Sequence, residues 1–499
     1  MTSDPSDPVQ AMIQKTARLL QDPREPLVAQ DITPLLQPLF QLLEQFPGHP
    51  RLHHLYGLAL DRSGDTNRAL HHVSRAIALE PGQVEPLRSL ALLLKKKGKP
   101  QVAEARIKDA IALQPDHAEL HFLLGDLCMD QGIMERAIAS FSRAIDLDPE
   151  FSSAWVNLGL CRKAMGDFPA AQACFERALE LDPDNALGHV NLALTLLLAG
   201  AYTRGFAEFE WRFRLPQGHP LPLEPPPGTP PWNGESLSGK KILVLAEQGY
   251  GDAIQFVRFI PNLHALGGQT LLAVPAPLES LFQEQQGLGR VQSTVRRDEK
   301  FDFFIPMMSL GRFFAPTPDT ISGPIPYLEA NRERAMAWER RLPPNRFRIG
   351  LVWAGKPLHA NDPLRRRSLP AAALTPLFQE QDNLLFVSLQ KESPTEVCFD
   401  LPPDRTVLDF GKELHDFADT AALMDRLDLI ITIDTAAAHL AGALGKPVRV
   451  LLPLAPDWRW SMDRTSSPWY PTSRLYRQTR PNHWEEPVAR LARDLKERP

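Results

Sequence analysis

The sequence predicts an all-α solenoid of helical repeats followed by an α/β region of two lobes, each built on a parallel sheet. Three observations predict this order. A 34-residue period runs through residues 1–215, a proline-rich segment follows it, and buried-strand patterns then alternate with helical patterns. The chain of 499 residues is long enough for roughly three domains. Its hydrophobic content of 43% lets each of them bury a core.

The repeat is defined by small residues and prolines spaced 34 positions apart. Glycine recurs at Gly64, Gly98, Gly132, Gly166 and Gly200. Alanine recurs at Ala69, Ala103, Ala137 and Ala171, and again at Ala76, Ala110, Ala144 and Ala178. Such a glycine ends a helix in a conformation that is costly for other residues, and small side chains let antiparallel helices approach closely. The pattern resembles the tetratricopeptide repeat (TPR), most clearly over 152–185. It predicts five to six TPRs over residues 1–215, with a degenerate first copy.

A solenoid of this kind has a concave groove lined by the first helix of each pair. The residues predicted to face it occupy the sixth position of each unit: Leu55, Ser89, Leu123, Asn157 and Asn191. An asparagine amide can donate to and accept from a bound peptide backbone. Asn157 and Asn191 are therefore predicted to contact a protein partner, and they resemble the asparagine ladder of O-GlcNAc transferase repeats. The alternative is that asparagine is simply common at this position of the repeat.

A proline-rich linker is predicted over residues 216–237. From Pro216 to Pro231, eight of sixteen residues are proline, which excludes a helix or a central strand. The segment is predicted to be a semi-rigid extended connector. The aromatic residues Trp211, Phe213 and Trp232 flank it and either dock it onto a neighbouring domain or leave it a plain spacer.

Seven strand-like runs follow the linker and divide into two Rossmann-like lobes. The runs are 241–246, 270–274, 301–306, 348–355, 383–390, 427–434 and 447–452. A helical stretch near residue 335 separates the first three from the last four, which places the lobes at 238–345 and 346–499. Strands that alternate with helices form parallel sheets with right-handed crossovers. Ligands of such sheets lie outside the carboxyl ends of the strands, so sites are predicted in the loops there.

The loop after the first strand carries Gln248, Gly249, Gly251 and Asp252. Its two glycines turn the chain tightly and place Asp252 at a helix N-terminus. The third glycine of a dinucleotide-binding loop is missing, so that class of site is not favoured. Asp252 is either a functional carboxylate or a helix cap.

The loop after strand 427–434 carries Asp434, Thr435, Ala436 and His439. The free N–H groups of a helix that begins at Thr435 form a ready anion site. His439 lies one turn further and could add a charge-assisted bond to a phosphate. The alternative is a core histidine.

Two further strand-end loops carry polar groups. The basic loop after strand 348–355 includes Arg367, and Gln390 and Lys391 follow strand 383–390. These side chains are suited to contacts with the phosphate, ribose or base of a nucleotide. The alternative is that they belong to ordinary polar loops exposed to solvent. No Asp-x-Asp pair occurs after the linker, so no metal site is predicted, and a leaving group's charge would fall to the helix dipole and cations.

Three longer segments resemble bacterial TPR proteins fused to a heptosyltransferase-related glycosyltransferase domain of the GT-B type. They are AEQGYGDAIQFVRFIP, DFADTAALMDRLDLIITIDTAAAHLAGALGKPV and APDWRWSMDRTSSPWYPTSRLYRQ. The resemblance implies that Asp252 is the catalytic base and that Asp434, Thr435 and His439 hold the donor diphosphate. It also implies that the first lobe binds the acceptor and the second the nucleotide sugar. Arg367 takes the place of a phosphate-binding lysine, although the tryptophan of that family motif is absent. Ala246 departs from the family's glycine.

The expected function is therefore that of an inverting, metal-independent glycosyltransferase without a cofactor. Its donor would be a nucleotide-diphosphate sugar, and its acceptor a hydroxyl on a protein, such as flagellin, held by the TPR groove. The alternatives are a non-catalytic TPR scaffold and a transferase for lipopolysaccharide sugars. The net charge of -5 argues against a nucleic-acid partner. The sequence contains no apolar run of about 18 residues, the length that a membrane-spanning helix needs. A cytoplasmic protein is therefore expected.

Overall fold

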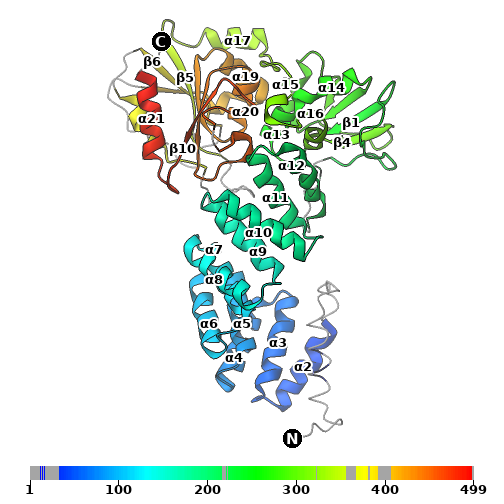
Figure 1. Cartoon of the computed structure of the whole chain (residues 1–499), viewed down its shortest axis with the longest axis vertical. Coiled ribbons are helices and arrows are strands. Elements are labelled where there is room, and N and C mark those ends of the chain that lie inside the picture. Colours follow the sequence, from blue (N-terminus) through cyan, green and yellow to red (C-terminus); the bar gives the residue numbers. More distant parts are fainter. Residues whose placement is uncertain are drawn as a thin grey trace. The chain divides into compact units, whose positions relative to one another are not determined.

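The chain folds into two compact units, which are drawn together in Figure 1. The computed structural model describes residues 12, 14, 16, 33–215, 221, 223–321, 323–355, 367–379, 383–391, 406–462 and 464–496. Unit 1 comprises Met1–Arg162 and Glu180–Asp182, and unit 2 comprises Lys163–Leu179 and Pro183–Pro499. Most of the predicted basic loop, residues 356–366, lies outside the described residues.

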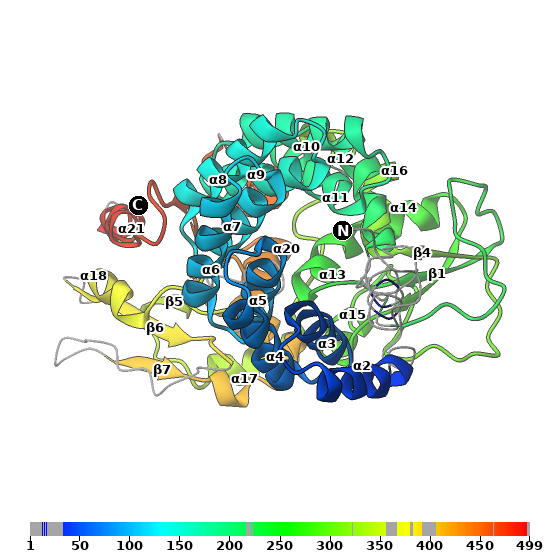
Figure 2. The same ribbon diagram turned by 90° about the horizontal axis from the view of Figure 1, so that it is seen from below.

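Unit 1 is a solenoid of antiparallel helix pairs, which confirms the helical repeats predicted from the sequence. Its helices are α2 (Thr33–Gln45), α3 (Pro50–Arg62), α4 (Thr66–Leu79), α5 (Val84–Lys96), α6 (Pro100–Leu113), α7 (Ala118–Asp130), α8 (Met134–Leu147) and most of α9 (Ser152–Ala164). Figure 2 shows α2 to α8 following one another along a curved path.

The small residues act as the repeat pattern predicts. A Cβ atom on Gly57 in α3 would lie 2.6 Å from Cγ2 of Val73 in α4, so only glycine lets these helices pack so closely. A Cβ atom on Gly125 in α7 would likewise lie 2.7 Å from Cε1 of the Phe141 ring in α8. The turn glycine Gly64 has φ 93°, a conformation that L side chains rarely adopt.

Unit 2 contains two parallel sheets, as predicted. The first is four-stranded, with the order β3-β2-β1-β4. Its strands are β1 (Lys241–Leu245), β2 (Gln269–Ala273), β3 (Arg290–Gln292) and β4 (Phe303–Pro306). Its helices are α13 (Tyr250–Phe256), α14 (Ile260–Ala265), α15 (Ala276–Gln283) and α16 (Gly311–Phe314). We call this part the first lobe; it is green in Figure 1. The next helix, α17 (Arg332–Glu339), packs on α19 (Phe417–Asp425) of the second lobe.

The second lobe holds a six-stranded parallel sheet with the order β10-β9-β8-β5-β6-β7. Its strands are β5 (Phe347–Val352), β6 (Leu384–Ser388), β7 (Val407–Asp409), β8 (Leu429–Ile433), β9 (Val448–Leu452) and β10 (Ser473–Arg477). Its helices are α18 (Thr375–Phe378), α19 (Phe417–Asp425), α20 (Ala436–Ala443) and α21 (Glu485–Lys496), with the 3₁₀ turn η8 (Trp458–Trp460) after β9. The apolar face of α21 packs with one face of this sheet in a core that includes Ile431 and Leu491.

The end of the repeat array belongs to the same compact unit as the lobes, so the boundary between compact units lies before the end of the array predicted at residue 215. The elements concerned are α10 (Phe168–Leu181, up to Leu179), α11 (Ala186–Leu198), α12 (Tyr202–Phe209) and the 3₁₀ turn η2 (Glu210–Arg214). Leu197 and Phe206 share one apolar core with Ile254 of α13 and Trp458 of η8. The physical reason for the shift is that these last helices bury their apolar faces against the lobes.

The described part of the predicted linker packs on the first lobe. Pro230 and Trp232 exchange backbone hydrogen bonds with Phe304 of β4, at 2.9 and 2.8 Å. The Trp232 side chain is 4% exposed, and its ring centroid lies 4.5 Å from that of Phe313. Of the two possibilities left open by the sequence, docking is the one that the structure shows for residues 230–232.

Candidate functional site

The loop between β1 and α13 is held in place from both ends. Glu247 is 3% exposed and accepts two hydrogen bonds from the buried Arg212 guanidinium, at 2.8 and 2.9 Å. The next residue, Gln248, has φ 59°. At the start of the helix, Asp252 accepts a 2.7 Å hydrogen bond from the Gly249 N–H. The N-cap of α13 is thus Gly249 rather than Asp252, and Asp252 is the third helical residue, which closes a capping box with its Oδ2 and leaves Oδ1 for another partner.

The loop between β8 and α20 presents a helix N-terminus. Thr435 is the N-cap of α20, but its side chain makes no capping bond; its hydroxyl lies 3.3 Å from that of Thr432. Ala436 and Ala437 follow and are only partly buried. Their N–H groups thus begin a helix at an accessible point, where its dipole favours an anion.

These two loops meet, which brings together the two predicted sites of the first and second lobes. A Cβ atom on Gly251 would lie 2.6 Å from Cδ2 and 3.3 Å from Nε2 of His439. Glycine at this position therefore lets α13 approach the His439 ring. The carboxyl ends of the two parallel sheets consequently share one site within unit 2.

Asp252 belongs to a charged cluster that the sequence did not predict. The other oxygen of its carboxylate, Oδ1, accepts from the guanidinium of Arg459 in η8, and the Asp252 side chain remains 17% exposed. The same guanidinium donates to Asp457 at 2.8 Å and also bonds Gln255 of α13. Burial alone would lower the pKa of Arg459, but Asp457 and Asp252 outweigh it and raise that pKa.

Asp434 has an unusual protonation behaviour for a carboxylic acid. Burial, and next the nearby charge of Asp457, raise the pKa of Asp434 to about 6. Arg367 and Arg459 oppose the shift, which places both cations near this carboxyl group. Asp457 itself has a lowered pKa because Arg459 outweighs the cost of its burial. One carboxylate of the site is therefore held ionised while the other is close to titration at neutral pH.

His439 is neutral rather than a cation. Burial, and next the charge of Arg459, lower the pKa of His439 to about 3. Its Nδ1 lies 2.9 Å from the Tyr470 hydroxyl, and its ring lies 5.5 Å from the Trp460 ring. A neutral imidazole N–H can still donate a charge-assisted hydrogen bond to a phosphate, because the acceptor is ionised, so the contact between His439 and a phosphate stays a prediction.

The remaining predicted residues have structural partners. Gln390 bonds the backbone of Ala354 at the end of β5 through both ends of its amide, each at 3.0 Å. Lys391 donates to the His415 carbonyl at 2.9 Å, just before α19. The Arg367 guanidinium lies against Gly355, where a Cβ atom would be 3.3 Å from its Nε. Arg367 is thus the member of this group that lies near Asp434.

The two predicted groove asparagines differ in their surroundings. Asn157 in α9 is half-buried and belongs to unit 1. Asn191 in α11 belongs to unit 2, is 7% exposed and donates to the Leu187 carbonyl at 3.0 Å. One N–H of its amide is therefore used within its own helix, and Asn191 is buried where α11 packs against η8 of the second lobe. Its contact with a bound peptide stays a prediction.

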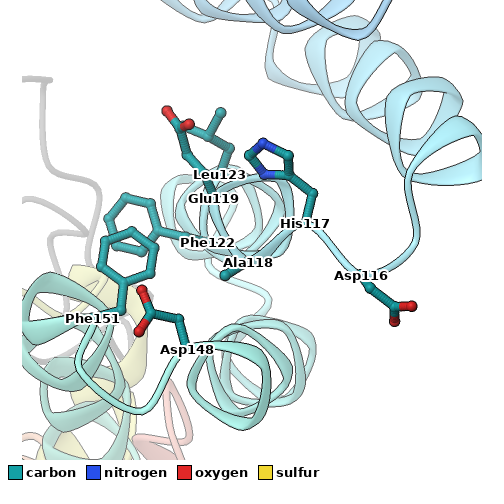
Figure 3. A pocket seen from close by; sticks show the side chains of 8 residues that line it. All are labelled: Asp116, His117, Ala118, Glu119, Phe122, Leu123, Asp148 and Phe151. Carbon is teal, nitrogen blue, oxygen red and sulfur yellow. The ribbon is translucent and has the colours of Figure 1, made fainter.

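Unit 1 has a hollow of about 590 Å³ among its repeats (Figure 3). Its lining residues come from the starts of α7 and α9: Asp116, His117, Ala118, Glu119, Phe122, Leu123, Asp148 and Phe151. The rings of Phe122 and Phe151 lie together on one side, with centroids 4.9 Å apart, and the Asp148 carboxylate lies beside them. Three carboxylates and no lysine or arginine line this hollow.

Two general features complete the description of the site. Within the described ranges, no three His, Cys, Asp or Glu side chains are grouped as a metal site would require. No helix in this part of the chain has the length and apolar character needed to cross a membrane.

Residues that the sequence reasoning missed lie in the loop after β9. Asp457 and Arg459 follow strand 447–452, so the strand-end rule could have singled them out. Tyr470 lies further along the same stretch, in which the sequence shows a family resemblance. The signal was therefore present, but it was not converted into roles for individual residues.

Models of the tetratricopeptide repeat match residues 88–150, 152–185 and 174–205. The N-terminal array is thus composed of TPRs. Protein FlbA of Caulobacter vibrioides is 28% identical to this chain over 334 residues, which is 60% of this chain and 53% of FlbA. The chain spans about half the length of this curated relative.

Three similar solved structures each cover about a third of this chain. MamA has 23% identity and a TM-score of 0.29, and the match covers 31% of this chain and 91% of MamA. PilF of Pseudomonas aeruginosa has 22% identity and a TM-score of 0.31, with 32% and 75% covered. YrrB, described as a TPR protein with an unusual peptide-binding site, has 17% identity and a TM-score of 0.30, with 36% and 93% covered.

Proposed function

We propose that this protein is a glycosyltransferase of the GT-B type that moves a sugar from a nucleotide-diphosphate donor to a hydroxyl of a protein acceptor. The observation that carries the proposal is the contact between Gly251 and His439, which joins the strand-end loops of two parallel sheets. Such a junction offers a helix N-terminus for an anion and a carboxylate, Asp252, beside it. These are the two groups that transfer from a diphosphate leaving group requires.

In the proposed reaction, the carboxylate of Asp252 accepts the proton of the acceptor hydroxyl as its oxygen attacks the sugar carbon. The bond between that carbon and the diphosphate oxygen breaks, and the diphosphate takes the electron pair. Arg459 can remain on Asp457 when Asp252 becomes neutral, because its guanidinium already donates to both carboxylates. The N-terminus of α20 and Arg367 stabilise the departing charge without a metal ion.

The repeats hold the protein acceptor in this proposal. TPR arrays bind protein partners along their groove. The hollow of unit 1 contains Leu123, one of the predicted groove residues, together with the Phe122 and Phe151 rings. Asp116 and Glu119 of this hollow already pair with Arg143 and Arg88, which leaves Asp148, beside the two rings, as the carboxylate that a lysine or arginine of the acceptor would meet.

A second candidate function, a non-catalytic scaffold, is favoured by one observation. Both oxygens of Asp252 already have partners, Gly249 and Arg459, so the carboxylate also fits a purely structural connection between the lobes. In that case the repeats would bind partners and the lobes would only support them. The two functions differ in whether Asp252 is needed for turnover or only for stability.

The test is sugar transfer by Asp252→Asn, assayed in the presence of EDTA. The amide keeps the size of the side chain but cannot accept a proton, so turnover should fall by about 10²–10⁴-fold. Affinity for a nucleoside diphosphate should change little, because that ligand does not need the base. Donors and nucleotides with uracil, guanine, adenine, cytosine and thymine bases would be screened first by thermal shift.

A matched control is Asp319→Asn, which breaks an exposed Asp–Arg pair with Arg464 in the same unit. It should retain full turnover. Undiminished transfer by Asp252→Asn would remove its role as a base. If none of the donors stabilises the wild-type protein and none is turned over, the scaffold function replaces the transferase.

A further inference from the structure

Lys163, at the end of α9, is a lysine of the repeat array that belongs to the unit with the lobes. It occupies the same repeat position as Lys95 in α5, two 34-residue units earlier. The Lys95 ammonium forms ion pairs with Asp126 and, at 3.0 Å, with Asp130. Among the described residues, no carboxylate lies within the 4.0 Å ion-pair distance of the Lys163 ammonium.

The turn after Lys163 is fixed to the loop that carries the charged cluster. A Cβ atom on Gly166 would lie 3.6 Å from Cγ of Leu454, three residues before Asp457. Tyr202 of α12 accepts a 2.8 Å hydrogen bond from the Trp469 indole, and its ring packs edge-on against Trp458 of η8. These contacts hold the last repeats against the stretch 454–469, so the position of Lys163 relative to Asp457 is built into unit 2.

The ammonium of Lys163 is short of negative charge. Burial lowers the pKa of Lys163 to about 8, and Asp457 is near enough to oppose that shift. The charge of Asp457 is already shared with Arg459, whose backbone N–H and guanidinium both donate to Asp457 Oδ1, at 3.1 and 2.8 Å. The same Asp457 influences Asp434 and His439 of the β8–α20 loop. Lys163 therefore lies near the charged cluster of Asp457, Arg459 and Asp252, and among the described residues no carboxylate forms an ion pair with its ammonium.

We propose that Lys163 is an anion-binding residue of the donor site, contributed by the repeat over residues 152–185, and that it binds the diphosphate of the nucleotide sugar. This inference rests on the proposed transferase function. It assigns to the repeats a direct part in donor binding, in addition to holding a protein. The chemistry is that of a point charge on a flexible stem, which suits a phosphate oxygen.

The binding test uses inorganic pyrophosphate and the nucleoside diphosphate that stabilises the wild-type protein. Both would be titrated by calorimetry into the full chain. Lys163→Met should weaken the affinity for each by about 10–100-fold, as expected for the loss of a charge-assisted hydrogen bond. Lys163→Arg should stay within about threefold of wild type because it keeps the charge. Lys95→Met, the matched control in unit 1, should bind as wild type does.

A second measurement needs no variant. The wild-type protein would be treated briefly with an amine-acylating reagent at pH 8, and modified peptides would be quantified by mass spectrometry. Pyrophosphate should slow acylation of Lys163 by at least about fivefold, since a bound anion protonates and covers the amine. Lys95 provides the internal reference and should not be protected.

The outcomes separate this inference from the proposed function. Normal pyrophosphate affinity in Lys163→Met, or no protection of Lys163, overturns the role of Lys163 and leaves the transferase proposal standing. A wild-type protein that binds neither pyrophosphate nor any nucleoside diphosphate overturns both. Weaker binding in Lys163→Met, with rescue by Lys163→Arg and protection of the wild-type lysine, supports the proposal.

Discussion

His439 is a buried imidazole whose protonation costs stability. Its folded-state pKa of about 3 lies below the ordinary value of 6.5. The unfolded chain therefore takes up a proton first as the pH falls, and the stability present above pH 6.5 is progressively lost toward pH 3. Between pH 7.5 and 5.5 this group should remove about 1.4 kcal/mol from the free energy of unfolding.

The corresponding prediction concerns His439→Gln. Because glutamine does not titrate, the variant should lose about 1.4 kcal/mol less stability than wild type over that pH interval. Urea unfolding followed by tryptophan fluorescence at both pH values measures the difference. An identical pH dependence in the two proteins would show that His439 takes up its proton equally easily when folded.

At the scale of single residues, the sequence predicted which loops carry the polar side chains of the site better than it predicted their protonation states. The strand-end rule placed Asp252 and His439 in loops that the fold brings together, and it excluded a dinucleotide loop for a stated reason. It could not predict that His439 is neutral, because that depends on Arg459 and on burial by Tyr470. Both residues are distant in sequence from the loop, so only the folded chain reveals their effect.

Among the elements, η2 is held to the first lobe by a buried ion pair. Arg212 is fully buried and its guanidinium bonds Glu247, while Glu210 and Ser309 accept its other N–H groups. Arg212→Met would leave the Glu247 carboxylate buried without a counter-charge. The free energy of unfolding should fall by about 3–5 kcal/mol.

Chemical denaturation of matched variants tests this pair. Adding Glu247→Gln to Arg212→Met should restore part of the stability, because the uncompensated charge is then removed. Arg204→Met breaks an exposed pair with Glu176 in the same unit and should cost less than about 1 kcal/mol. A loss this small in Arg212→Met would mean that Glu247 is neutral or solvated without its partner.

Most strands were predictable from the sequence because they are buried runs of apolar residues. The segments 241–246 and 447–452 match β1 and β9 to within one residue at each end. The missed strands lack that signal: β3 and β7 have three residues each, and in β10 the pair Leu475 and Tyr476 is flanked by Arg474 and Arg477. Edge strands such as these are defined by their pairing partners rather than by their own composition.

At the scale of the whole molecule, the apolar core of unit 2 extends from the lobes into the last repeats. A fragment beginning at Ser238 would expose the lobe surfaces that Leu197, Tyr202 and Phe206 cover. We predict that this fragment aggregates or unfolds at a much lower temperature, whereas one beginning at Ser152 folds. Gel filtration and thermal unfolding of the two fragments distinguish them, and equal stability would contradict the single core.

The sequence suggested a division at residue 215 because the repeat pattern continues up to it. A repeat motif records only how each helix pair packs internally and on its neighbours in the array. It contains no sign that α11 and α12 pack on a different domain, because the apolar residues that do so look like ordinary repeat residues. The boundary between compact units was therefore not predictable from periodicity.

The apolar core shared by the lobes and the last repeats limits where whole repeats can be gained or lost in this protein. A solenoid lengthens or shortens by whole units, and in this chain only the repeats before Lys163 are outside the lobe core. Insertions or deletions of 34 residues there would alter the reach of the array while leaving the charged cluster intact. Near Gly166 or Tyr202, the same event would remove part of the site. Family members should therefore vary in repeat number at the N-terminal side and keep the last two repeats constant.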